Sequence, residues 1–217
     1  MTSPRTRRRL LWHHLPIAIG CILMSAVVIA VLSGSKRLAF QWSMATAYVG
    51  LALLAATLVT GPLSALRGRR HPISSDLRRD LGIWAGLAAL IHFVVGWQVH
   101  MKHRYLYWLH EVPGTTRLAL RHDLFGAANF AGLGAVVVAV CLLGLSNDRS
   151  LSALGARRWK KMQRSNYALF GLVVLHGAAY QVTERRTPAF VVAFLLLSLG
   201  AVSLQLAGVR ARRERDS

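Results

Sequence analysis

The stretch Leu81–Met101 reads LGIWAGLAALIHFVVGWQVHM and contains no Asp, Glu, Lys or Arg. About 20 apolar residues in a helix cross the ~30 Å hydrocarbon core of a bilayer, so this run predicts a membrane-spanning helix. Strands of a membrane barrel would alternate apolar and polar residues, and this stretch is apolar on all sides. The run therefore indicates a chain that folds in lipid.

Five further runs have the same property, on both sides of the first. The six charge-free runs cover residues 15–34, 42–63, 81–101, 124–145, 166–183 and 188–209. Composition agrees with them, because only 16% of the residues are charged, against about 25% in a soluble domain. The sequence predicts an all-α polytopic membrane protein, a six-transmembrane-helix bundle that forms a single domain over residues 1–217.

The chain is also strongly basic, with 27 Lys and Arg, 8 Asp and Glu and a formal net charge of +19. The N-terminus, the second and fourth loops and the C-terminal tail together hold 19 of the basic residues, and the other loops hold 8. The positive-inside rule places the richer side in the cytoplasm, which predicts a plasma (inner) membrane protein with both termini cytoplasmic. Membrane lipid is the expected contact of these loops. Nucleic acid is not, because half the chain lies in long uncharged runs.

Three histidines are the only side chains inside the runs that could carry a positive charge near neutral pH: His92, His100 and His176. Polar groups at membrane depth are costly and tend to be functional. His92 lies 12 residues after Asp80 and His176 lies 12 residues after Arg164. Both are therefore ~18 Å from a charge at the same membrane face. A bare metal ion needs three or four ligands, whereas a haem needs only two axial ligands.

The matched depth of His92 and His176 therefore favours a haem whose iron both histidines bind. Small residues that would leave room for a flat macrocycle flank each of them: Ala85, Ala88, Ala89 and Gly96 near the first, Gly171, Gly177 and Ala179 near the second. The alternative stays open that the small residues mark plain helix packing and that the histidines only hydrogen-bond neighbouring helices.

Three motifs around these histidines resemble a known family. They are RRDLGIW at 78–84 followed by His92, LGARRW at 154–159 leading to Tyr167 and His176, and AATLVTGPL at 55–63. Together they resemble the ferric-reductase-like transmembrane domain family, and within it the MsrQ/YedZ type of haem-binding membrane subunit. The resemblance covers about residues 42–183. It implies a b-type cytochrome that passes electrons through the membrane, with His92 and His176 as ligands of haem b.

The resemblance also contains a departure. The family usually has another histidine thirteen residues before the later ligand, and this chain has Gln163 there. Glutamine is a poor haem ligand, which argues against a second, cytoplasmic haem. In the outer loop, His100, His103, His110 and His122 could build an outer haem or metal site or contact a quinone or protein partner; alternatively, they are simply interfacial.

The basic residues of the cytoplasmic loops allow several roles as well. Arg79 and the run 157–164 could clamp a haem propionate or dock an acidic flavoprotein; alternatively, they only record membrane topology.

Larger members of the family continue into a flavin and nicotinamide domain, but this chain contains no Gly-x-Gly-x-x-Gly or P-loop pattern. We therefore expect an oxidoreductase-type electron-transfer component without catalytic residues of its own. A cytoplasmic flavin reductase or membrane quinol would be the donor, and a periplasmic redox protein the acceptor. Two other hypotheses remain: a self-sufficient ferric or cupric reductase that uses His100, His103 and His110, and a non-redox transporter or assembly scaffold.

Overall fold

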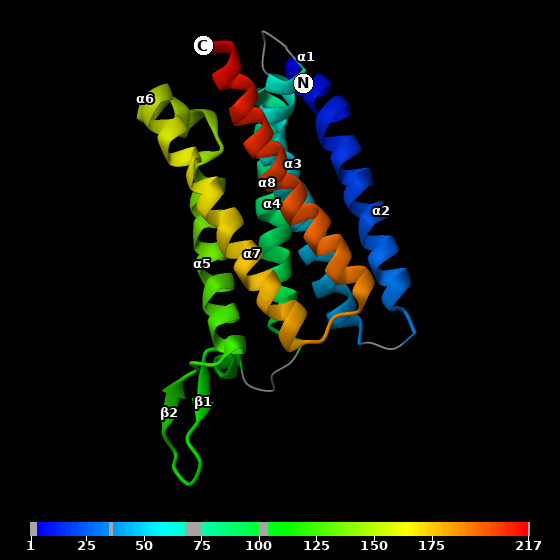
Figure 1. Cartoon of the computed structure of the whole chain (residues 1–217), viewed down its shortest axis with the longest axis vertical. Helices are drawn as coiled ribbons and strands as arrows, with labels where there is room; N and C mark the ends of the chain where they lie inside the picture. The colour runs from blue at the N-terminus through cyan, green and yellow to red at the C-terminus, as the bar shows by residue number, and fades with distance from the viewer. Residues whose placement is uncertain (1–3, 35–36, 68–74, 100–103, 217) are drawn as a thin grey trace.

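The chain is almost entirely helical (Figure 1). A computed structural model describes residues 4–34, 37–67, 75–99 and 104–216. The helices of these ranges are α1 (Pro4–Arg9), α2 (Leu15–Leu32), α3 (Leu38–Leu66), α4 (Ser75–Gly96), α5 (Leu124–Leu145), α6 (Asp148–Gln163), α7 (Ser165–Thr183) and α8 (Pro188–Asp216). A π-helical turn, η1 (Leu10–His14), joins α1 to α2, and a 3-10 turn, η2 (Arg104–Tyr107), precedes the short strands β1 (Leu109–Glu111) and β2 (Leu118–Leu120).

Five helical segments within the described ranges are long and apolar enough to cross a membrane: Arg7–Leu32, Leu38–Leu66, Asp76–Gly96, Leu124–Leu145 and Pro188–Arg215. Large apolar side chains such as Ile22, Val31 and Leu196 are exposed on the outside of the bundle, as lipid contact requires. The protein is therefore an all-α, multi-pass membrane protein. Helix α7 has 19 residues and is not one of the five, because polar residues such as Asn166 and His176 lower its mean hydropathy.

Helix α3 is the centre of the bundle. It packs against α2, α4 and α8, while α5 packs against α7. Most of the buried side chains belong to α3, including Leu58, which is 1% exposed. In α2, Val28 alone is buried. The bundle thus has two parts, one centred on α3 and the other formed by the α5–α7 pair. Residues of both parts line the cavity described below.

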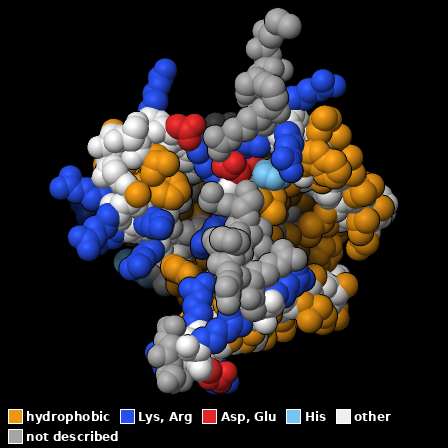
Figure 2. All heavy atoms as spheres, turned by 90° about the horizontal axis from the view of Figure 1, so that it is seen from above, with side chains coloured by type: hydrophobic (Ala, Val, Ile, Leu, Met, Phe, Trp, Pro, Cys, Tyr) orange, Lys and Arg blue, Asp and Glu red, His pale blue; other side chains and the backbone are white. Residues whose placement is uncertain are grey.

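The two ends of the bundle differ in charge. Both termini and α6 lie at one end, and the β-hairpin extends from the other (Figure 1). Seen from the end with the termini, Lys and Arg side chains gather on the surface (Figure 2). We call it the basic end. Asp80 is fully buried there, with an exposure of 0%. Its carboxylate pairs with the Arg9 guanidinium and accepts a 2.7 Å hydrogen bond from His13 Nδ1.

Each expected run coincides with an observed helix, although α3 and α4 begin at residues 38 and 75, before the predicted 42 and 81. Helix α5 spans the predicted residues 124–145, and α7 begins one residue before the predicted 166. Helix α4, however, ends at Gly96, so the predicted span was wrong over residues 97–99, and its predicted end at Met101 lies outside the described residues. The amide of Val99 donates to the Gly96 carbonyl at 3.1 Å, which closes a turn instead of continuing the helix.

The loops contain structure that the charge pattern does not reveal. Strands β1 and β2 form an antiparallel hairpin in which Leu109 pairs with Leu120. The basic segment after α5 forms α6, which Gly155 interrupts with a φ of 70°. The indole nitrogen of Trp159 donates to the Leu145 carbonyl at 2.8 Å and holds α6 against the end of α5.

Candidate functional site

A cavity lies inside the bundle, lined by residues of α3, α4, α5, α7 and α8 and by the loops at the hairpin end. Most of its lining is apolar or small, including Ala85, Ala89, Gly96 and Gly177. These four belong to the small residues that flank the two histidines in sequence; the other three, Ala88, Gly171 and Ala179, are not part of the lining, so the prediction was wrong for them. A mostly apolar cavity with a few polar groups is the usual form of a cofactor site.

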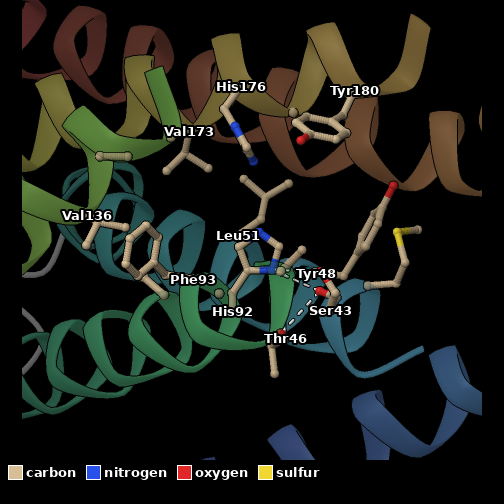
Figure 3. A pocket seen from close by; sticks show the side chains of 18 of the residues that line it. Ser43, Thr46, Tyr48, Leu51, His92, Phe93, Val136, Val173, His176 and Tyr180 are labelled. Carbon is tan, nitrogen blue, oxygen red and sulfur yellow. Dashed lines mark hydrogen bonds between the residues drawn. The ribbon is translucent and has the colours of Figure 1, made fainter. Parts of the chain in front are cut away.

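His92 and His176 project into this cavity from α4 and α7 and point toward one another (Figure 3). Their ring centres are 6.1 Å apart, and the ring planes make an angle of 76°. The two histidines, which the sequence predicts at the same membrane depth, thus face each other in the structure. An imidazole nitrogen binds a transition metal at about 2 Å and lies about 1 Å from its own ring centre, so two imidazoles on one metal have centres about 6 Å apart.

Each imidazole is also held in one tautomer by the backbone. Nδ1 of His92 lies 2.9 Å from the Ser43 carbonyl, and Nδ1 of His176 lies 2.8 Å from the Ala128 carbonyl. A carbonyl oxygen only accepts, so both Nδ1 atoms must be protonated and donate. The Nε2 lone pairs are then available as ligands, in the arrangement by which metal-binding histidines are usually oriented.

Gly132 of α5 makes room for the second histidine. A Cβ at this position would lie 2.7 Å from Nδ1 and 2.9 Å from Cε1 of His176, closer than real Cβ contacts come. The imidazole of His176 therefore rests directly on the α5 backbone. With the facing imidazoles, their fixed tautomers and the small lining residues, this cradle makes the site fit a haem held by two axial histidines.

Hydrogen-bonded polar side chains line the part of the cavity nearer the hairpin. The Tyr180 hydroxyl donates to Asn129 Oδ1 at 2.9 Å, and the ring of Tyr180 lies 4.9 Å from that of His176. Nε2 of Gln181 donates to the Tyr48 hydroxyl at 3.3 Å. The other amide atom of this side chain, Oε1, is buried without a hydrogen-bond partner. This wall offers polar groups to any ligand that extends from the histidines toward the hairpin.

Arg186 is the one charged side chain among the described residues that line the cavity. It follows α7 and lies over the ring of Phe40, with Cζ 4.8 Å from the ring centre. Burial lowers the pKa of the Arg186 guanidinium, and the negative charge of Glu184 acts in the opposite direction. The guanidinium is half-buried, and a cation partly removed from water marks a place where an anion would be stabilised.

The other residues considered from the sequence lie elsewhere. Arg79 is near the basic end, where it donates to the Ser146 carbonyl at 2.9 Å and pairs with Asp148 at 2.6 Å. It is not part of the cavity lining. Gln163 ends α6, and its Nε2 is buried without a hydrogen-bond partner.

The histidines of the outer loop are not brought together in the described structure. His110 lies in β1, and His122 is exposed just before α5. His100 and His103 fall outside the described residues. Across the described part of the chain, no group of three or more His, Cys, Asp or Glu side chains could hold a metal ion.

Several lining residues escaped sequence reasoning. Tyr180 and Gln181 carry a usable signal, because they follow His176 by about one turn on the same helix. Arg186 resembles any other loop arginine in the sequence. Gly132 lies on a third helix, and only packing shows that it faces His176.

Comparison with known proteins adds no assignment: no protein-family model matches the chain, and no solved structure matches it.

Proposed function

We propose that the protein is a membrane b-type cytochrome in which one haem b is bound by His92 and His176. The observation that carries this proposal is the facing pair of imidazoles, 6.1 Å apart, each fixed by a backbone carbonyl so that Nε2 is the free nitrogen. The resemblance to the ferric-reductase-like transmembrane family points to the same two residues. When bound, a haem supplies reversible one-electron chemistry, with a potential that the ligands and burial set.

The residues of the chain have distinct tasks in this proposal. His92 and His176 hold the iron, and the carbonyls of Ser43 and Ala128 orient the two rings and raise their basicity as ligands. The apolar lining excludes water, which keeps the site in a medium of low dielectric. The chain itself carries out no substrate chemistry, and its function is electron transfer between partners on the two sides of the membrane.

Six membrane crossings belong to the same proposal, with α7 as the sixth. Both termini lie at one end of the bundle (Figure 1), which requires an even number of crossings. The polar side chains that lower the hydropathy of α7 include His176, Tyr180 and Gln181, and all three line the cavity. They are thus turned away from lipid. The basic end would face the cytoplasm by the positive-inside rule.

The partners follow from this orientation. The donor would be a flavin reductase in the cytoplasm or a quinol in the membrane. The acceptor would be a redox protein on the outer, periplasmic side of the plasma membrane. The β-hairpin is at the end where such an acceptor would approach (Figure 1).

The test is a reduced-minus-oxidised absorption spectrum of the purified protein and of three variants. Wild type should show the bands of a b-type haem. His92→Ala and His176→Ala should each lose them, while His122→Ala, a histidine exposed outside the cavity, should retain them. A wild type without bands, or bands that survive in both ligand variants, would refute the proposal.

A further inference from the structure

The cavity has a direction, because Tyr180, Gln181 and Arg186 line it on the hairpin side of His176. On α7, the rise from His176 to Thr183 at the end of the helix is about 10 Å. Gln181 lies along this path and Arg186 lies just beyond it, and both line the cavity. Away from the hairpin, the cavity is lined by apolar residues such as Leu54, Ala85 and Leu169. A ligand with one polar edge would therefore have a single favourable orientation.

The position of Arg186 is fixed from two sides. Its backbone amide donates to the Gln181 carbonyl at 3.1 Å, which closes the turn after α7. Its guanidinium stacks over Phe40 at the start of α3. Among the described residues no carboxylate forms an ion pair with it. An arginine that faces an apolar cavity without such a partner is costly, unless the ligand brings the anion.

Gln181 lies beside this path but offers no free donor. Its Nε2 donates to the Tyr48 hydroxyl, whose own proton is donated to the Phe190 carbonyl at 2.7 Å. The Gln181 amide is therefore fixed with Oε1, an acceptor, as its unpaired atom. The guanidinium of Arg186 is thus the group at this end of the cavity that can bind a carboxylate.

We propose that Arg186 binds the propionate carboxylates of the haem and so fixes the propionate edge toward the hairpin end of the bundle. This inference rests on the proposed function, because it needs a haem on His92 and His176. It assigns Arg186 as a positioning residue. Its consequence is that the polar edge of the cofactor faces the outer side, where an acceptor would receive the electron.

The test uses the haem-loaded protein and three variants: Arg186→Gln, Arg186→Lys and, as matched control, Arg185→Gln. Arg185 is adjacent and exposed and is not part of the cavity lining. The first measurement is the rate of haem release to excess apomyoglobin. A charge-assisted hydrogen bond contributes enough to slow release by about 10- to 100-fold. Arg186→Gln should therefore release haem about that much faster, Arg186→Lys should fall in between, and Arg185→Gln should match wild type.

The second measurement is the propionate-bending band in the resonance Raman spectrum, which a general loosening of the helices would not shift. The band should shift in Arg186→Gln and stay at the wild-type position in Arg185→Gln. An unshifted band in Arg186→Gln, or haem release at the wild-type rate, would overturn the assignment of Arg186. A wild type that binds no haem would instead overturn the proposed function, so the two failures are distinguishable.

Discussion

A methyl group added at Gly132 would fall 2.7 Å from Nδ1 of His176, on the ring that we propose as a haem ligand. Gly132→Ala must therefore displace the imidazole or the α5 backbone. Displacement of the ring breaks its 2.8 Å hydrogen bond to the Ala128 carbonyl, and overpacking of this kind costs about 2 kcal/mol. If that cost is expressed in haem binding, affinity should fall by about 30-fold.

The assay is the haem-to-protein ratio after purification, followed by haem release to apomyoglobin. Gly134→Ala is the matched control on the same helix, because its Cβ would lie 3.5 Å from the nearest atom of Leu172, an ordinary contact. The control should bind haem as wild type does. If Gly132→Ala has the same haem content and the same release rate as Gly134→Ala, the argument that His176 needs this cradle is wrong.

Three further predictions concern the scaffold. Asp80→Ala removes the fully buried carboxylate that pairs with the half-buried Arg9 guanidinium and should destabilise the protein by about 3 kcal/mol. Asp148→Ala, at a side chain that is 86% exposed, should change thermal stability in detergent little. The Asp123 carboxylate caps α5 by accepting a 2.7 Å hydrogen bond from the Gly126 amide. Asp123→Ala should therefore lower the stability of this helix end by about 1 kcal/mol, measured as faster hydrogen exchange at the start of α5. Asp123→Asn, which keeps an acceptor, should lower it less. The neighbouring Arg121 guanidinium lowers the pKa of Asp123. The stabilisation by this cap should therefore be complete above the pKa of Asp123 in the unfolded chain and lost as pH falls through its pKa in the folded protein; equal exchange protection, relative to the unfolded chain, at acid and neutral pH would contradict this. In intact cells an impermeant maleimide should label a cysteine placed at Thr115 and not one placed at Ser152, and the reverse pattern would refute the orientation.

Much of the fold can be predicted from the stretches of sequence that contain no charged residues. Charge-free runs locate the helices because lipid excludes Lys and Arg, and the helical rise from Asp80 and Arg164 correctly predicts that His92 and His176 share a depth. The same reasoning misplaced the end of α4. The sequence contains no charged residue just after Gly96, so the absence of charge gives no sign that the helix ends there. The helix ends because local backbone hydrogen bonds form a turn, and these cannot be predicted from composition.

The remainder of the site depends on how the helices are rotated and packed. Helical spacing from His92 correctly selects Ala85 and Ala89 as cavity residues, since they lie on the same helix. It cannot select Gly132, which reaches His176 from a third helix. Nor can it select Arg186, whose guanidinium turns into the cavity only because a loop closes after α7.

The central claim, one haem between two crossed imidazoles, is tested most directly by the electron paramagnetic resonance spectrum of the oxidised protein with a haem count. The account predicts one haem per chain and a strongly anisotropic low-spin ferric signal, because ring planes 76° apart leave the iron d-orbitals nearly degenerate. Two haems per chain, no haem, or a high-spin signal with an open axial position would contradict it.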